Sequence, residues 1–453
     1  MATLHIQIPD SFVPERKYAL HVLFEVYLGI SINTQVATTS IEAYLISLEN
    51  GKQLIIKDAF FSSIDPTEGY LHRKHLPERT VTCGFPTSTD QSIIAPFGKG
   101  EIHMDTDVIH LDVDIIASAF FFLSRWEDHV IEAKDSHERP LESKTYMIRH
   151  GLQHRPLVNE YVDLLKELLS TLGMSIPSQT HQFKIKVTHD VDHIARYDSI
   201  KKLVRAMAGD IILRKNPFRM VWTLLEYTLV NLNLRKDNYD SIDWLMDVSE
   251  SYHLKSHFYF IPSHSGEKDA RYDIRDPRIA SSIARIQDRG HIAGFHGSYI
   301  SYDNPTQFST ELERLRNVGA DVAEGRQHYL RFSNPTTWQL WNSNHLTSDS
   351  SVGYNSDIGF KAGTCIPYPV FDVVNRAQLG LVEYPLIIME VPLIKKYARV
   401  EKAMEASKPV IDQCRKHNGQ FVFLWHPENF NHPFWGKYRE LYTMILDYAT
   451  RKS

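Results

Sequence analysis

Apolar and charged residues alternate through the segment 183–187, where Phe183, Ile185 and Val187 are separated by lysines. This period of two predicts a β-strand. Between this strand and the end of the chain, apolar residues recur at helical spacing over 243–254, 277–289, 305–318 and 397–417, and further strand-like stretches begin near residues 256, 290, 326, 387 and 420. Strands that alternate with helices are typical of a parallel sheet or barrel, so we predict an α/β fold for this part of the chain.

The first 150 residues follow a different pattern, typical of a smaller α/β domain of their own. Strand-like stretches flank Asn50-Gly51, and this pair predicts a hairpin because it suits the positive φ angles of a tight type I′ turn. Apolar residues recur at helical period over 18–29, and the apolar run 114–126 predicts a buried helix. We therefore predict an N-terminal domain over 1–150, followed by a helix and a linker over 151–181.

A chain of 453 residues is too long for one ordinary hydrophobic core, which favours two domains. The net charge of −5 shows no footprint of nucleic-acid binding. Three scattered cysteines, Cys83, Cys365 and Cys414, do not form a disulfide framework and fit a reducing compartment. The sequence contains no secretory signal and no apolar run that is long enough to be a transmembrane segment, so we expect a cytoplasmic protein.

A basic segment at 200–238 interrupts the alternation of strands and helices. Between positions 200 and 236 this segment has only two acidic residues, Asp210 and Glu226. Its basic residues are more numerous: Lys201, Lys202, Arg205, Arg214, Lys215, Arg219, Arg235 and Lys236. Such an insertion is commonly a pair of helices packed on the barrel with a solvated basic face. The alternatives are that residues 201–236 cover an acidic glycan or make peripheral contact with an anionic membrane.

Polar side chains capable of chemistry gather where the predicted strands end. Asp190 and Asp192 are two residues apart, so they share one face of an extended strand. Two adjacent carboxylates ionise together only if a cation or a strong donor lies between them. His296, Arg326 and His426 follow the ends of later strands. Each histidine taken alone is more commonly structural, but the carboxyl ends of parallel strands meet at one edge, which predicts a shared pocket that holds a cation.

The motifs at these strand ends resemble the ordered motifs of the polysaccharide deacetylase family, the carbohydrate esterases with NodB homology. They are Thr188-His-Asp-Val-Asp192, His296, Arg326-Gln-His-Tyr329 and Leu424-Trp-His426. The resemblance covers residues 183–430 and points to a divergent bacterial branch with an extra N-terminal domain. It implies a distorted (β/α)7-type barrel over 182–453.

The resemblance also implies a role for each residue of the motifs. Asp190 would be the catalytic base, Arg326 would orient it, and His426 would protonate the leaving group. Asp192 and His296 would bind a divalent metal ion, with zinc as the first choice.

One position departs from the pattern of the family. The second metal-binding histidine is expected four residues after His296, where this chain has Ile300, which cannot bind a metal. We predict that His328, on the next strand end, replaces it. The alternatives are a two-ligand site completed by water, loss of the metal, or a ligand from His189 or His193, which otherwise would orient the ligating groups.

Two aromatic residues beside the motifs, Tyr329 and Trp425, are predicted to contact a sugar ring, with core packing as the alternative for Trp425. The leading hypothesis is a metal-dependent hydrolase that removes an acetyl or similar acyl group from an amino sugar or glycan precursor. The other hypothesis is a catalytically silent carbohydrate-binding protein on the same barrel, favoured by Ile300. Both have a carbohydrate as the partner.

Overall fold

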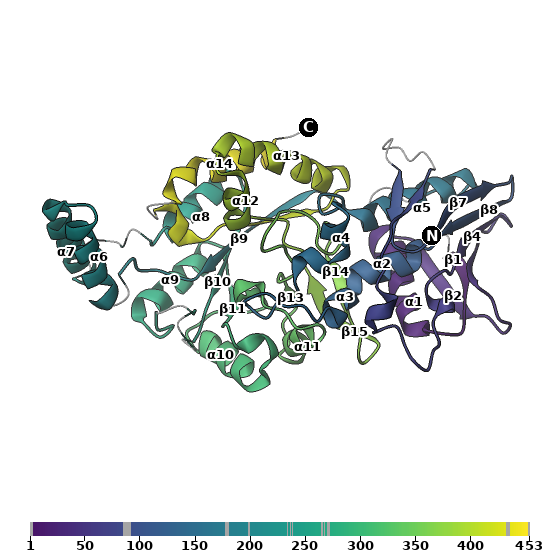
Figure 1. Ribbon diagram of the computed structural model, residues 1–453, viewed down its shortest axis with the longest axis horizontal. Helices are drawn as coiled ribbons and strands as arrows, with labels where there is room; N and C mark the ends of the chain where they lie inside the picture. The colour runs from purple at the N-terminus through teal and green to yellow at the C-terminus, as the bar shows by residue number, and fades with distance from the viewer. Residues whose placement is uncertain are drawn as a thin grey trace. The chain divides into compact units, whose positions relative to one another are not determined.

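The structure is a computed structural model that describes residues 3–84, 92–176, 181–197, 200–232, 234–235, 237, 239–263, 266, 268–269, 272–431 and 435–451 (Figure 1). The chain has a mixed α/β fold and forms two compact units. The first unit contains Met1–Ile185, Tyr329–Lys396 and Glu405–Val422, and the second contains Lys186–His328, Tyr397–Met404 and Phe423–Ser453. The borders of these units differ from the domain borders predicted at 150 and 182, which remain a sequence-based prediction.

A six-stranded sheet forms the N-terminal part of the first unit. Its order is β2-β1-β3-β4-β8-β7, with bounds Ser31–Val36, Thr3–Ile8, Ala43–Ser47, Gln53–Lys57, Val108–Val113 and Gly98–Met104. Its helices include α1 (Val13–Leu20), a π-helix (His21–Tyr27), α2 (Ile115–Ser124), α3 (Trp126–Val130), α4 (Tyr146–Arg149) and α5 (Leu157–Thr171). The predicted buried helix at 114–126 is confirmed, since every residue of α2 is buried and Asp114 caps its first turn by accepting a hydrogen bond from Ala117 N–H at 2.9 Å.

The predicted hairpin around Asn50-Gly51 is confirmed, but the predicted type I′ turn is wrong. Strands β3 and β4 pair antiparallel, and the Leu48 N–H donates to the Lys52 carbonyl at 2.9 Å, which leaves a three-residue loop. Only Gly51 has a positive φ, at 84°, within this loop. A type I turn followed by a left-handed glycine is the usual geometry of three-residue hairpin loops.

The segment Tyr329–Lys396 adds a second set of strands to the first unit. The hairpin β14 (Tyr368–Asp372) and β15 (Ala377–Glu383) is antiparallel, and β15 also pairs in parallel with β13 (Ser348–Asp349). This hairpin was not predicted from the sequence pattern. The other elements here include α11 (Thr336–Ser343) and the short strand β16 (Ile388–Met389).

Parallel strands form the core of the second unit. Their order is β12-β11-β10-β9, with bounds Glu324–Gln327, Ile292–Gly297, Ser256–Phe260 and Lys184–Val191. The last residues of β17 (Gln420–Leu424) follow beside β9, where the Trp425 N–H donates to the Thr188 carbonyl at 3.1 Å. The strands predicted near 183, 256, 290, 326 and 420 are thus confirmed, whereas a closed (β/α)7 barrel stays a prediction.

Helices follow the parallel strands as the alternation predicts. They include α8 (Ile242–Ser251), α9 (Pro277–Asp288), α10 (Pro305–Asn317) and α14 (Arg439–Thr450), and α12 (Glu390–Tyr397) and α13 (Val400–Lys416) precede β17. Asp276 and Asn304 cap α9 and α10, and each is followed by a proline in the first turn. The basic insertion holds two helices, α6 (Ile200–Ile212) and α7 (Pro217–Asn231). Among the described residues, no helix has the length and apolar character needed to cross a membrane.

Gly325 lies inside β12, where its backbone comes close to that of β11. A Cβ atom at this position would meet the Phe295 carbonyl oxygen at 1.8 Å, so a larger residue would push β11 and β12 apart. The glycine is therefore required by the close approach of two backbones.

A buried polar cluster joins β9, β10 and β12 near their amino-terminal ends. The Glu324 carboxylate accepts hydrogen bonds from Lys186 Nζ at 2.9 Å and from the Tyr259 hydroxyl at 2.8 Å, and it lies 2.6 Å from His257 Nδ1. Burial alone would raise the pKa of Glu324, but His257 and Lys186 outweigh burial and hold the pKa far below its ordinary value.

We predict that Glu324→Gln lowers the free energy of unfolding by about 2 kcal/mol or more at neutral pH, because Lys186 then faces a neutral amide in a largely buried site. A carboxylate with a depressed pKa stabilises the fold above its unfolded-state pKa of about 4.3, and the difference from the wild type should shrink as the pH falls below that value. Chemical denaturation at several pH values measures both effects.

The matched control is Glu401→Gln, since Glu401 lies 3.5 Å from Arg399 but is 68% exposed. We expect a change of less than about 0.5 kcal/mol for this surface pair. Equal stability of Glu324→Gln and the wild type at neutral pH would contradict the role given to the cluster.

Candidate metal centre

The end of β9 presents Thr188, Asp190 and Asp192 on one face, as the period of a strand requires. His189 therefore points to the other face, where it is fully buried and its Nδ1 lies 2.8 Å from the Trp425 carbonyl oxygen. Burial lowers the pKa of His189 to about 3. The sequence offered two roles for His189, a substitute metal ligand or a group that orients the ligands. Neither applies, because His189 is a neutral core histidine.

Asp190 forms a buried ion pair with Arg326 from β12. Arg326 Nη1 donates to Asp190 Oδ1 at 2.8 Å and to the Thr188 hydroxyl at 3.1 Å. Burial alone would raise the pKa of Asp190, but the positive charge of Arg326, with help from His296 and His426, outweighs burial and lowers it. The carboxylate is thus held ionised.

Gly294 of β11 makes room for this ion pair. A Cβ atom on Gly294 would lie 2.6 Å from the Tyr259 ring, which occupies the space where a side chain would be. The Arg326 guanidinium carbon lies 5.3 Å from the centre of that ring. Arg326 therefore reaches across β11 and β10, over an aromatic face, to the end of β9.

Asp192 and His296 bring two hydrogen-bond acceptors together. His296 Nδ1 lies 2.7 Å from the Arg326 carbonyl oxygen, so Nδ1 carries a proton, and in a neutral ring the lone pair is on Nε2. His296 Nε2 is 3.4 Å from Asp192 Oδ1, and both atoms are buried without a hydrogen-bond partner. Two buried lone pairs that face each other are unfavourable unless a cation or a proton lies between them.

His328 completes a group of three possible ligands. Its Nε2 lies 3.5 Å from Asp192 Oδ2, and its Nδ1 lies 3.0 Å from Asp269 Oδ1. Burial would lower the pKa of His328, but the carboxylates of Asp192 and Asp269 raise it to about 9. One ligand atom from each of Asp192, His296 and His328 lies within 4.8 Å of the other two.

The three residues fit a divalent metal ion. A carboxylate oxygen and two imidazole nitrogens are a common donor set for catalytic zinc, and they leave a coordination position open. Asp269 would orient His328 through the second ring nitrogen, as carboxylates do for metal-binding histidines. Binding of a cation would displace the proton that the two carboxylates hold on His328.

The structure accounts for the histidine that is absent at position 300. Ile300 is 41% exposed, and the adjacent Ser301 donates its hydroxyl hydrogen bond to the Ser298 carbonyl at 3.0 Å. Neither side chain offers a ligand. His328, which the sequence suggested as the replacement, lies beside Asp192 and His296 instead.

His426 lies on the more open side of the same group. Its Nε2 is 3.7 Å from Asp192 Oδ2, and its side chain is 14% exposed, compared with 1% for that of His296. It lies two residues after the end of β17, so its position depends on the place of that strand beside β9.

The two aromatic residues predicted to contact a sugar lie in different surroundings. Trp425 is fully buried and packs on Phe430, with ring centres 5.4 Å apart, so it has no face free for a sugar and the core-packing alternative holds. Tyr329 belongs to the first unit, has a φ of 59° and is 38% exposed. Its ring stacks on His137 at 4.5 Å.

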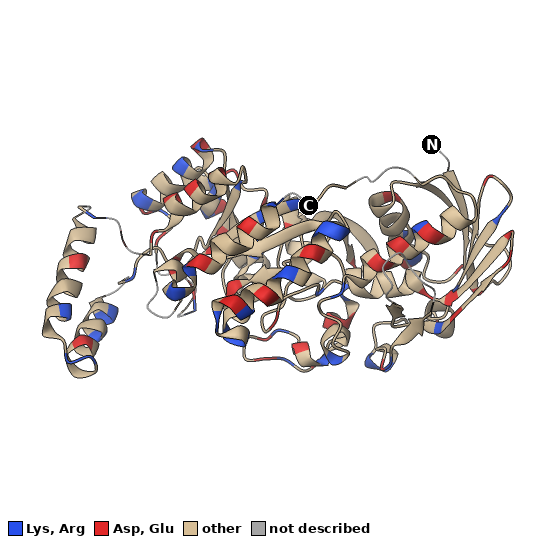
Figure 2. Ribbon diagram, turned by 90° about the horizontal axis from the view of Figure 1, so that it is seen from above, with Lys and Arg blue, Asp and Glu red and all other residues tan. Residues whose placement is uncertain are grey.

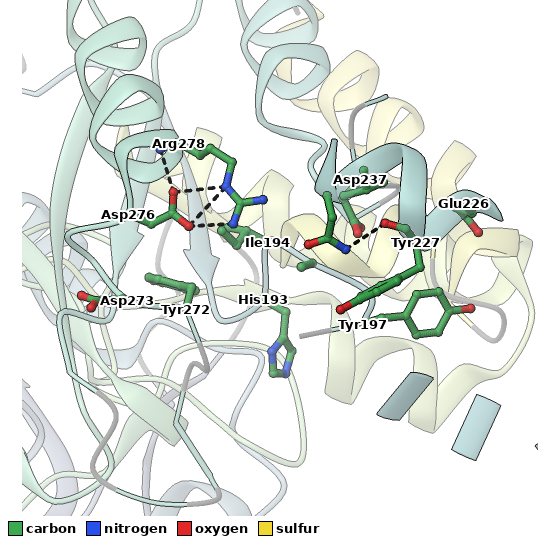
Figure 3. A pocket seen from close by; sticks show the side chains of 13 residues that line it. His193, Ile194, Tyr197, Glu226, Tyr227, Asp237, Tyr272, Asp273, Asp276 and Arg278 are labelled. Atoms are coloured by element: carbon green, nitrogen blue, oxygen red, sulfur yellow. Dashed lines mark hydrogen bonds and ion pairs between the residues drawn. The ribbon is translucent and has the colours of Figure 1, made fainter. Parts of the chain in front are cut away.

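His193, which follows Asp192, lines a cavity of about 200 Å³ in the second unit and is not one of the three clustered ligands (Figure 3). Tyr272 lines the same cavity and donates its hydroxyl hydrogen bond to the Val191 carbonyl at 2.8 Å. The other polar walls include Tyr197, Glu226, Asp237, Asp273, Asp276 and Arg278. The cavity therefore begins one residue beyond the proposed metal ligand.

Asp269 is the site residue that sequence reasoning missed. It lies in an irregular segment and is 2% exposed, and its Oδ1 also accepts a hydrogen bond from the Tyr299 N–H at 2.7 Å. No periodicity or motif distinguishes it from other loop aspartates. Only a search for a carboxylate between the second and third strands would have made it a candidate.

The chain is similar to one family of unknown function and to two solved structures. Residues 4–174 match the family described as "Family of unknown function (DUF7033)". No curated protein matches the chain. Among solved structures, "Crystal structure of putative polysaccharide deacetylase from Mycobacterium smegmatis" has 14% identity and a TM-score of 0.35, covering 60% of this chain and 86% of that chain. "Crystal structure of Puue Allantoinase" has 10% identity and a TM-score of 0.37, covering 59% and 84%. Structural likeness this weak carries no argument about function.

We predict that the purified protein binds about one divalent metal ion per chain and that Asp192→Ala and His296→Ala each abolish this binding. His328→Ala should weaken it by about tenfold or more, because the third ligand is lost. Elemental analysis of dialysed protein measures the metal content of each variant. The rise of the melting temperature on adding zinc measures how far binding is weakened.

The matched control is Ile300→Ala. This variant changes the position at which the family pattern has a metal-binding histidine, and it should leave the metal content unchanged. Retention of the metal by His328→Ala together with its loss in Ile300→Ala would contradict the ligand set.

Proposed function

We propose that this protein is a metal-dependent hydrolase that removes an acetyl or similar acyl group from an amino sugar or glycan precursor. The observation that carries the proposal is the pair of buried, unpartnered atoms Asp192 Oδ1 and His296 Nε2, which lie 3.4 Å apart. His328 lies beside them and a separately ion-paired carboxylate, Asp190, is adjacent. A cation site next to an ionised carboxylate that can take up a proton is the arrangement that hydrolysis of an amide or ester requires.

Asp190 is the proposed general base. Its ion pair with Arg326 keeps it ionised and fixes its orientation, so it can accept a proton from the attacking water. Its other oxygen, Oδ2, lies 3.7 Å from His296 Nε2 and therefore faces the ligand group. Arg326 is a positioning residue in this scheme.

His426 is the proposed general acid. Its partial exposure and its distance of 3.7 Å from Asp192 Oδ2 place the imidazole at the edge of the ligand group, where it can donate a proton to the departing nitrogen or oxygen. A divalent cation, when bound, supplies Lewis acidity and lowers the pKa of water towards about 7. Zinc suits the donor set of one carboxylate and two imidazoles.

The substrate class rests on the resemblance of the motifs to the polysaccharide deacetylase family, as does the proposed (β/α)7-type barrel for the C-terminal part of the chain. The cavity that begins at His193 is a candidate place for part of a glycan, since its walls carry tyrosines and carboxylates. Tyr329, which is exposed, is the proposed aromatic contact to the sugar. Trp425 is not proposed again, because it is buried.

We predict that the metal-loaded protein releases acetate from acetylated amino-sugar oligomers and that Asp190→Asn lowers kcat by at least about 100-fold with the metal content unchanged, because only the base is lost. Enzymatic detection of acetate and elemental analysis on the same sample separate the two effects. The matched control, Asp303→Asn, changes an aspartate in the short helix Ser301–Asp303 and should leave kcat within about twofold.

A catalytically silent glycan-binding protein is the second candidate, and the exposed Ile300 in place of a histidine favours it. Under this alternative the protein binds acetylated oligomers in calorimetry but releases no acetate, even when it is loaded with zinc. Turnover that disappears in Asp190→Asn excludes the silent alternative.

A further inference from the structure

We propose that the helical hairpin α6–α7 docks the protein on an anionic lipid surface. The hairpin is defined here as residues 200–232, and its two helices pack against each other (Figure 1). The proposal is independent of the hydrolase activity, because it rests on a different part of the second unit.

The seam between the two helices is polar. The Asp210 carboxylate of α6 accepts a hydrogen bond from the Thr223 hydroxyl of α7 at 2.9 Å. Arg214 Nη1 lies 2.8 Å from Asp210 Oδ1. Asp210, Thr223 and Glu226 are buried, with exposures of 2–6%. A helical pair of a globular protein normally buries its apolar stripe, so a buried polar seam leaves the apolar residues for another surface.

The apolar residues of the hairpin and of the residues just after it are exposed. Twelve of the eighteen exposed large hydrophobic side chains in the described part of the chain lie between positions 200 and 234. Phe218, Val221, Trp222 and Leu225 form a stripe with the spacing i, i+3, i+4, i+7 on α7. The two most exposed are Phe218 at 87% and Leu213 at 83%, on either side of the turn. A concentration of this kind marks a docking surface.

The charge of the hairpin opposes the charge of the whole protein. Six basic residues lie in the hairpin, against Asp210 and Glu226, whereas the whole chain has a net charge of −5. Figure 2 shows the blue segments of the hairpin's ribbon beside its few red ones. The turn combines Arg214, Lys215 and Arg219 with the exposed Leu213 and Phe218. The partner must therefore accept apolar side chains and carry negative charge.

An anionic membrane meets both conditions. Helices with exposed apolar residues, aromatic side chains and surrounding lysines and arginines lie in the interface of a bilayer. A helix of 15 residues, the length of α7, is too short to span the hydrocarbon core, so it would lie along the surface. A second copy of the chain is the poorer partner, because two hairpins with the same positive charge repel each other.

Docking through this hairpin would place a second feature near the lipid surface. The other side of α7 supplies Glu226, Tyr227, Val230 and Asn231 to the wall of the cavity that begins at His193 (Figure 3). One helix thus separates the proposed docking surface from the cavity. A glycan attached to a lipid is the substrate class that would use both.

The test is sedimentation of the full-length protein with lipid vesicles. We expect binding to vesicles of phosphatidylcholine with about one third phosphatidylglycerol, weak binding to phosphatidylcholine alone, and loss of binding as salt rises. The variant Phe218→Ser/Trp222→Ser should reduce the partition coefficient by about tenfold or more, because it removes two exposed aromatic anchors. Arg205→Glu/Lys215→Glu, at two exposed positions, should reduce it by a similar factor and remove most of the dependence on salt.

The matched control is Val374→Ser/Met444→Ser, which removes two hydrophobic side chains that are exposed elsewhere, at 53% and 36%. This control should bind as the wild type does, and thermal melts should show that all variants are folded. Absence of binding to the anionic vesicles at low salt overturns the proposal. So does a dimer in light scattering that Phe218→Ser/Trp222→Ser dissociates, since the partner would then be a second copy.

Discussion

The buried ion pair between Arg326 and Asp190 is the interaction on which the proposed site depends. A guanidinium and a carboxylate are costly to remove from water, so each must find the other with good geometry, and they meet at 2.8 Å across two intervening strands. The pairing requires the register of the four parallel strands, the absence of a side chain at Gly294, and the Tyr259 ring beneath the guanidinium. It leaves Asp192 without a counter-charge from an arginine.

The remaining charges follow from that arrangement. Asp192 and Asp269 are two further carboxylates in the same region, and the neighbouring groups are histidines. Imidazoles balance carboxylates only by taking up protons, which is why the pKa of His328 rises to about 9. A divalent cation would balance the same carboxylates and engage the lone pairs of neutral rings, and its binding would compete with protonation of His328.

The second unit also separates two kinds of surface. Of the proposed metal ligands, His296 and His328 are buried and Asp192 is half-buried, whereas the hairpin α6–α7 exposes hydrophobic side chains and positive charge. The Asp210 carboxylate lies between the two helices and accepts hydrogen bonds from Thr223 and Arg214 within the hairpin. Mostly polar groups inside the hairpin and apolar groups outside reverse the usual order in a soluble fold, and this reversal is the observation behind the proposed docking surface.

The sequence alone determined the local features of this protein. The period of two in β9 placed Asp190 and Asp192 on one face, and the caps and prolines before α9 and α10 marked where those helices begin. These features depend on residues close in the chain. The tertiary structure alone decided that His328 lies beside Asp192 and His296, that the loop residue Asp269 contacts His328, and that Trp425 is core. Periodicity reports the face of one element, whereas ligation joins residues far apart, whose approach is set by sheet register and by the turns that follow each strand.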